Sequence, residues 1–216
     1  KLQQTRKNME RRAEMAVEEK RGLLKNIEKT DSLRLEGLAY HAARLVEGVD
    51  LSLFYDNKQI CGPITFEIGR GERVALEGRN GSGKSSLLKL ICGGDVDFTG
   101  RFSIGSGLKI SYVPQDASFL RGELDEYARK CGVDTALFKT LLRKLDFKRE
   151  HFEREMQFYS DGQKKKVLLA RSICERAHLY VWDEPLNYID IFSRIQIEEM
   201  LSDMNGALLF VEHDRA

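Results

Sequence analysis

The chain has 216 residues, of which 42% are apolar and 32% are charged, so it can bury one substantial core and is globular rather than disordered. Its net charge of +1 excludes a general electrostatic affinity for nucleic acid, so any basic surface must be local. No apolar run approaches the ~18 residues of a membrane span, and no signal peptide opens the sequence. The four cysteines form no C-x-x-C pair, which favours reduced structural thiols in a cytoplasmic protein. Because the first residue is Lys and the last follows a strand-like run, we expect a piece of a longer protein.

Residues 1–29 are rich in Glu, Lys, Arg, Ala and Met, a composition that predicts a helix. Leu2, Met9, Ala16 and Leu23 recur every seven residues and form a narrow apolar seam. Nine Lys or Arg residues against five Glu residues give this segment a local charge of +4. Two interpretations remain open, namely half of a coiled-coil hairpin with a solvated basic face, or an arm that touches a phosphate backbone.

Residues 30–42 break the helix and form a connector, and strand-like sequence follows. Residues 50–55 and 64–68 have partly alternating apolar positions, which predict two strands with a turn at Gly62 and Pro63 between them. Residues 73–77 read as a buried strand that feeds the glycine-rich stretch described next.

Residues 78–85 fit the G-x-x-x-x-G-K-[ST] phosphate-binding loop at every fixed position, and a predicted helix over 86–91 follows. Its glycines let successive backbone N–H groups point at phosphate oxygens, and the start of a helix favours anions. Lys84 adds a cation, and the Ser85 hydroxyl can ligate Mg²⁺. The alternative is a glycine-rich turn that binds nothing, but the order of strand, loop and helix favours a nucleotide site.

The rest of the chain alternates between strand and helix patterns, which implies a mainly parallel sheet with helices on its faces. Charged sequence with apolar residues three and four apart predicts a purely helical insertion over 121–158. The remaining predicted strands are 100–104, 108–113, 179–182 and 207–211, and the remaining predicted helices are 162–175 and 190–203.

The strand over 179–182 ends in Asp183 and Glu184. Ligands bind at the carboxyl ends of the strands in such a sheet, so Asp183 is expected to hold Mg²⁺ through water. Glu184 is then expected to polarise a water molecule for in-line attack on a γ-phosphate. The alternative is a solvated turn at the end of a strand, although two adjacent acids repel each other unless chemistry uses them.

The stretch Tyr-Ser-Asp-Gly-Gln over 159–163 opens a helix, with Ser160 as its N-cap. In this context it resembles the signature sequence of ATP-binding-cassette ATPases. The family's other motifs follow in order, with Tyr55 where an aromatic ring stacks on adenine, Gln115 before the helical insertion, a D-loop over 185–190 and His213 as the switch histidine. The resemblance covers residues 43–216.

This resemblance implies an α/β fold of the P-loop NTPase class, with a mainly parallel core sheet, an antiparallel β-subdomain and an α-helical subdomain over about 118–160. It implies that two cassettes pack head to tail around ATP, so the isolated chain needs a second cassette and is expected to be a monomer without ATP and a weak or inactive ATPase. The implied catalytic residues are Glu184, His213, Gln115 and Lys84, and the implied Mg²⁺ ligands are Ser85, Gln115 and Asp183. The implied ATP-binding residues are Tyr55, Gly78, Asn80, Gly81, Ser82, Gly83, Lys84, Ser85, Ser86, Ser160, Gly162 and Gln163.

Asp161 departs from the family pattern, because it occupies the first of two positions that are usually glycine in the signature. A carboxylate that faced a γ-phosphate at low dielectric would repel it. We therefore expect the Asp161 side chain to point away from the completed site and the ATPase rate there to be reduced.

The D-loop sequence has Asn187 where transporter cassettes usually have Ser. In this it resembles the D-loop of the ABC-F family, whose members are two-cassette proteins that act on ribosomes. Residues 1–29 would then be the second arm of the linker between the cassettes, and the run over 182–194 resembles Lsa-type antibiotic-resistance members. Two alternatives are the ATPase subunit of a membrane transporter and a non-catalytic nucleotide-binding module. The lysines over 164–166 are interpreted either as a solvated face or as an RNA-facing patch.

Overall fold

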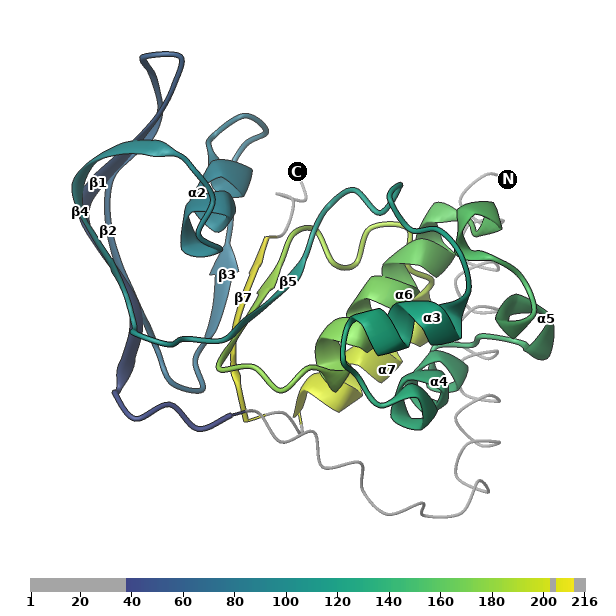
Figure 1. The fold of residues 1–216 in the computed structure, drawn as a ribbon. Coiled ribbons are helices and arrows are strands. Elements are labelled where there is room, and N and C mark those ends of the chain that lie inside the picture. Colours follow the sequence, from purple (N-terminus) through teal and green to yellow (C-terminus); the bar gives the residue numbers. More distant parts are fainter. Residues whose placement is uncertain (1–37, 203–204, 212–216) are drawn as a thin grey trace, which may run out of the picture. The chain divides into compact units, whose positions relative to one another are not determined.

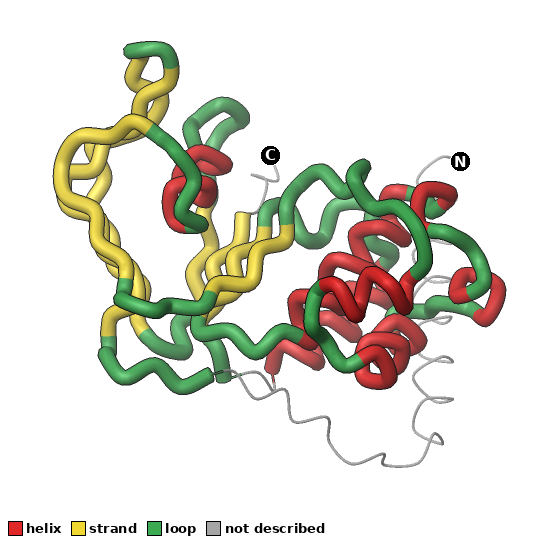
Figure 2. The backbone as a smooth tube through the Cα atoms, in the orientation of Figure 1, coloured by secondary structure: helices red, strands yellow, loops and turns green. Residues whose placement is uncertain are grey.

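The computed structural model describes residues 38–202 and 205–211, all within the second of two compact units, Leu35–Ala216. The predicted basic helix over 1–29, most of the predicted connector over 30–42, and His213 lie outside the described residues. Two sheets and the helices around them build the described part (Figures 1 and 2).

The first sheet is antiparallel, with the order β2-β1-β4. Its strands are β1 (Arg44–Tyr55), β2 (Lys58–Gly69) and β4 (Asp97–Ile104). Asp56 and Asn57 form the two-residue loop between β1 and β2, and both have positive φ angles, 48° and 61°. Asp and Asn tolerate this backbone conformation better than other residues with a side chain, and it matches the twist of a tight hairpin.

The predicted turn at Gly62 and Pro63 is wrong, because both residues lie inside β2. Leu53 pairs with Cys61 and Leu51 pairs with Ile64, so β2 carries one extra residue at this point and forms a bulge. Glycine and proline signal a bulge as well as a turn, and only the pairing of the strands distinguishes the two.

The second sheet is fully parallel, with the order β3-β7-β6-β5, which confirms the predicted parallel core. Its strands are β3 (Arg73–Leu76), β5 (Ile110–Val113), β6 (Leu179–Trp182) and β7 (Ala207–Val211). All four residues of β6 are buried, as expected of an inner strand that is covered on both faces. Its side chains alternate between two clusters, since Val181 packs with helix α2 (Lys84–Ile91) and Trp182 packs with the helices of the opposite face.

Helices cover the second face of the parallel sheet (Figure 1). Residues 121–158 contain no strand, as predicted. None of the helices in the described ranges is long and apolar enough to cross a membrane. The four cysteines are free thiols, as expected. Helix α6 (Asp161–Cys174) packs against β5, α4 (Thr135–Lys144) packs against α6, and α3 (Leu124–Lys130) packs against α4. The remaining helices that follow the insertion's start are α5 (Arg149–Phe152) and α7 (Ile191–Ser202), with a 3₁₀ turn at Met156–Phe158.

Candidate functional site

The glycine-rich loop joins β3 to α2, as the sequence predicts. Gly83 has a φ of +88°, and a Cβ atom there would lie 2.7 Å from the Cβ atom of Cys61 in β2. Both the backbone conformation and the close strand exclude a larger residue at this position. The antiparallel sheet therefore supports the loop from behind.

Lys84 folds back over this loop and is 9% exposed. Its ammonium donates hydrogen bonds to the carbonyl oxygens of Gly78 at 2.5 Å and Arg79 at 3.0 Å. The loop is thus closed around its own cation. This arrangement gives a concave set of backbone groups with a positive charge at its centre, which suits phosphate groups.

Asp183 follows β6 and is 2% exposed. Burial raises the pKa of its carboxyl group, while a hydrogen bond with the Ser85 side chain acts in the opposite direction. The Oδ1 atom of Asp183 is buried without a hydrogen-bond partner. A buried carboxylate oxygen without a partner, beside a serine hydroxyl, fits a hard cation such as Mg²⁺, which prefers oxygen ligands.

Glu184 is 8% exposed, and two side-chain amides hold its carboxylate. Gln115 donates to Oε2 at 2.7 Å, and Asn187 donates to the same atom at 2.6 Å. The backbone of Glu184 has a φ of 48°, which is costly for a residue with a side chain and is concentrated at functional sites. The Asn187 contact was not predicted, because the sequence indicates Asn187 only as a D-loop residue that distinguishes subfamilies.

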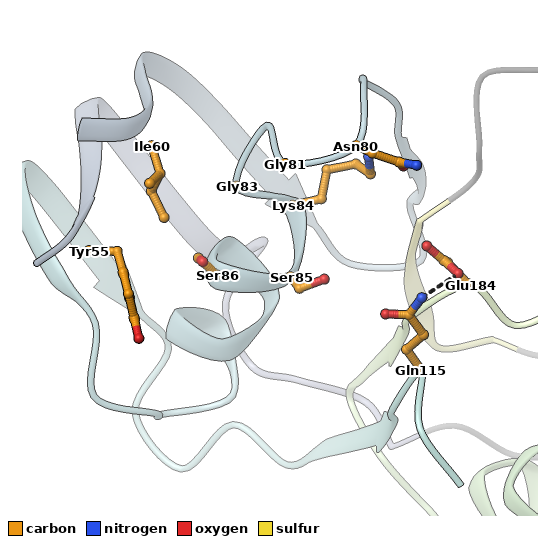
Figure 3. Close-up of a pocket in the computed structure, with 10 residues that line it drawn as sticks. All are labelled: Tyr55, Ile60, Asn80, Gly81, Gly83, Lys84, Ser85, Ser86, Gln115 and Glu184. Atoms are coloured by element: carbon orange, nitrogen blue, oxygen red, sulfur yellow. Dashed lines mark hydrogen bonds between the residues drawn. The ribbon is translucent and has the colours of Figure 1, made fainter. Parts of the chain in front are cut away.

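Lys84, Gln115 and Glu184 line one pocket of about 400 Å³, within the size range of ligand sites. The predicted site residues Gly78, Ser82 and Asp183 do not line it. Figure 3 shows the ring of Tyr55 at one end of the pocket and the Gln115–Glu184 hydrogen bond at the other, with Ser85 between them. Ile60 is a lining residue that sequence analysis missed, since its place in β2 carries no motif. The pocket brings together nine predicted site residues, namely Tyr55, Asn80, Gly81, Gly83, Lys84, Ser85, Ser86, Gln115 and Glu184.

The predicted signature residues lie at the start of α6 and do not line this pocket. Ser160 caps the helix as predicted, accepting from the backbone N–H of Gln163, whose side chain accepts from the backbone N–H of Ser160. A Cβ atom on Gly162 would lie 2.5 Å from the carbonyl oxygen of Tyr188, so the D-loop needs a glycine here. Asp161 lines an adjoining pocket of about 270 Å³.

Both interpretations of the lysines over 164–166 are wrong, since Lys164, Lys165 and Lys166 are only 9%, 3% and 8% exposed. Lys166 pairs with Asp190 at 2.6 Å. Lys165 donates to the backbone carbonyls of Pro114 and Asp183 and was missed as a site residue. The available signal was three cations within the first two turns of the helix, near the end where the macrodipole disfavours cations unless acceptors lie nearby.

A phosphate loop between a parallel strand and a helix, beside an acid pair at the end of a neighbouring strand, defines a P-loop nucleotide-binding domain. The sequence model of a family described as ABC transporter matches residues 61–187. The chain therefore belongs to this family, as an ATP-binding domain.

Curated relatives agree with this assignment. ATP-binding protein Uup of Caulobacter vibrioides is 28% identical over 215 residues, covering 95% of this chain and 35% of the relative. ABC transporter F family member 2 of Arabidopsis thaliana is 32% identical over 168 residues, covering 74% of this chain and 25% of the relative. The chain thus spans about a third or less of these relatives.

Solved structures share the fold. A putative ABC transporter (ATP-binding protein) from Pyrococcus furiosus matches with a TM-score of 0.66 and 24% identity. The match covers 79% of this chain and 92% of the other.

Proposed function

We propose that this chain binds Mg²⁺–ATP and hydrolyses it together with a second cassette. The observation that carries this proposal is the Glu184 carboxylate, which two amides orient at the edge of the pocket that Lys84 and Ser85 line. A carboxylate held in this way can accept a proton from a water molecule, and its neighbours can bind the phosphates that the water attacks.

Each residue has a separate task in this proposal. The Lys84 ammonium and the loop N–H groups bind the β- and γ-phosphates, and Tyr55 stacks on the adenine. Ser85, Gln115 and Asp183 would hold Mg²⁺, which neutralises charge on the phosphates. Glu184 accepts the proton of the attacking water at its carboxylate.

The site is proposed to be incomplete in this chain alone. Ser160, Gly162 and Gln163 carry the signature but lie outside the nucleotide pocket, so we infer that they contact ATP bound to another cassette. The longer relatives leave room for such a second cassette. His213, which lies outside the described residues, is proposed to contact the γ-phosphate.

Within the family, we propose that the parent protein is an ABC-F member that acts on the ribosome in the cytoplasm, with residues 1–29 as a linker arm. The name of the Arabidopsis relative and the Asn187 D-loop support this subfamily. The resemblance of residues 182–194 to Lsa-type members supports a role in antibiotic resistance by ribosomal protection.

The catalytic proposal is tested with Glu184→Gln in the full-length parent. We expect ATP binding to be retained and hydrolysis to fall by about 100-fold or more, as expected for loss of a general base. Glu126→Gln, an exposed residue of α3, is the matched control and should hydrolyse ATP normally. Unchanged turnover in Glu184→Gln removes this residue from the proposed role.

The ribosomal proposal is tested with the same Glu184→Gln parent. It should sediment with ribosomes in the presence of ATP and separate from them when nucleotide is removed. Stable association with an integral membrane subunit in place of ribosomes would instead support the transporter alternative.

A further inference from the structure

Lys165 has the least exposed side chain among the lysines that the structure describes, at 3%. Its ammonium donates hydrogen bonds to the carbonyl oxygens of Pro114 at 2.9 Å, Asp183 at 2.9 Å and Gln115 at 3.4 Å. A buried ammonium is costly unless its donors are satisfied, and here three backbone carbonyls receive them.

The three acceptors belong to two loops that leave neighbouring strands. β5 and β6 pair up to Val113 and Trp182, and the N–H of Asp183 donates to the Val113 carbonyl at 2.8 Å. Beyond that point the two strands no longer pair. Lys165 lies where the ladder ends and joins the two loops through one charged group.

These loops carry the residues of the proposed reaction. Gln115 follows β5, Glu184 follows β6, and their side chains are hydrogen bonded to each other at 2.7 Å. Lys165 does not line the nucleotide pocket, but it lines the adjoining pocket together with Gln115 and Glu184. It thus approaches both residues from the adjoining pocket.

The charges agree with this geometry. Burial lowers the pKa of Lys165 to about 8, while the negative charges of Asp183 and Glu184 act in the opposite direction. Two adjacent carboxylates repel each other, and a cation behind them offsets that repulsion.

We propose that Lys165 is a positioning residue, which ties the loop after β5 to the end of β6 so that Gln115 and Glu184 meet at the edge of the nucleotide pocket. The inference rests on the proposed ATPase function. Lys165 touches neither nucleotide nor water in this proposal and acts through the two loops that it joins.

The test is Lys165→Met in the full-length parent, which keeps the length of the side chain and removes all three donors. We expect kcat to fall by about tenfold or more, because displacing reacting groups by ~1 Å costs up to ~100-fold. KM for ATP should change by less than about threefold, because the phosphate loop is untouched.

Arg171→Met is the matched control. Arg171 is a partly buried cation of α6, and it also donates to a β5 carbonyl, that of Tyr112, but it lies farther along the helix from the site. The Arg171→Met substitution should lower the midpoint of thermal unfolding about as much as Lys165→Met does. It should leave kcat within about threefold of the value for the unsubstituted protein.

The outcomes separate the two proposals. If the unsubstituted parent does not hydrolyse ATP, the proposed function fails. If the unsubstituted parent hydrolyses ATP, three results would each overturn the positioning role of Lys165. They are an unchanged kcat in Lys165→Met, a change mainly in KM, and a loss of kcat no larger than that in Arg171→Met.

A measurement on the unsubstituted protein applies if Lys165→Met does not fold. The NMR signal of the Lys165 Nζ group should shift when Mg²⁺–ATP is added, because both loops that it joins belong to the site. An unchanged signal in the nucleotide-bound protein also overturns the role.

Discussion

The side-chain amide of Gln115 donates to the Glu184 carboxylate over 2.7 Å, although the two residues are 69 positions apart in the sequence. The parallel pairing of β5 and β6 brings them together, since each residue follows its strand closely. A change that disrupts the end of β5 or of β6 would therefore displace the Glu184 carboxylate, even if the phosphate loop stayed intact.

Lys84→Met should weaken ATP binding. The substitution removes a charge-assisted contact worth about 1.5–3 kcal/mol, which corresponds to roughly 10- to 150-fold in Kd. Titration calorimetry with ATP measures the change. Lys89→Met, which alters an exposed lysine of the same helix, should bind ATP as the unsubstituted chain does, and an equal loss in both variants would contradict the role of Lys84.

Tyr55→Ala should weaken binding of ATP but not of tripolyphosphate. The Tyr55 side chain is 69% exposed at one end of the pocket, so its loss removes base stacking worth about 1–3 kcal/mol without opening the core. Tyr55→Phe keeps the ring and should bind ATP normally. Equal weakening of both ligands by Tyr55→Ala would mean that Tyr55 does not contact the base.

Gly162→Ala should destabilise the fold by about 1–3 kcal/mol, because the new methyl group would lie 2.5 Å from the backbone carbonyl of Tyr188 and would force α6 and the D-loop apart. Urea unfolding measures the loss. Asp161→Ala is the neighbouring control, since it removes only a favourable charge at the helix start and should cost less than about 1 kcal/mol. An unchanged free energy of unfolding in Gly162→Ala would contradict this prediction, because it would mean that the D-loop moves away from the methyl group without loss of stability.

Asp190→Asn should change how the free energy of unfolding depends on pH. Burial alone would raise the pKa of Asp190, but hydrogen bonds from Lys166 and Ser193 outweigh it and lower the pKa to about 2, below the ~3.9 of an unfolded chain. Stability from this carboxylate is therefore present above about pH 4 and is lost as the pH falls towards about 2.

The measurement is urea unfolding of both chains across that range. The gap in unfolding free energy between the unsubstituted chain and Asp190→Asn should narrow as the pH falls. In a Lys166→Met background the effect of Asp190→Asn should shrink, because the salt bridge is already absent. A gap that stays constant with pH would contradict the proposed ion pair.

Much of the fold was predictable because local patterns report local structure. The apolar run of β6 was placed at its observed bounds, and the start of α6 followed from its Ser160 cap. The bulge in β2 was mistaken for a turn, because Gly62 and Pro63 break a ladder in either case and only strand pairing tells which.

The phosphate loop was recognisable from the sequence alone, since a run of eight residues carries its own backbone conformation, its cation and the hydroxyl that we propose as a Mg²⁺ ligand. The sequence also indicated Asp183 and Glu184 as candidate site residues, because they directly follow a buried strand. The contacts of Gln115 and Asn187 with Glu184, and the burial of Lys165, became visible only in the folded structure. These contacts depend on which strands are neighbours and on where a long side chain finds acceptors, and no local pattern encodes either.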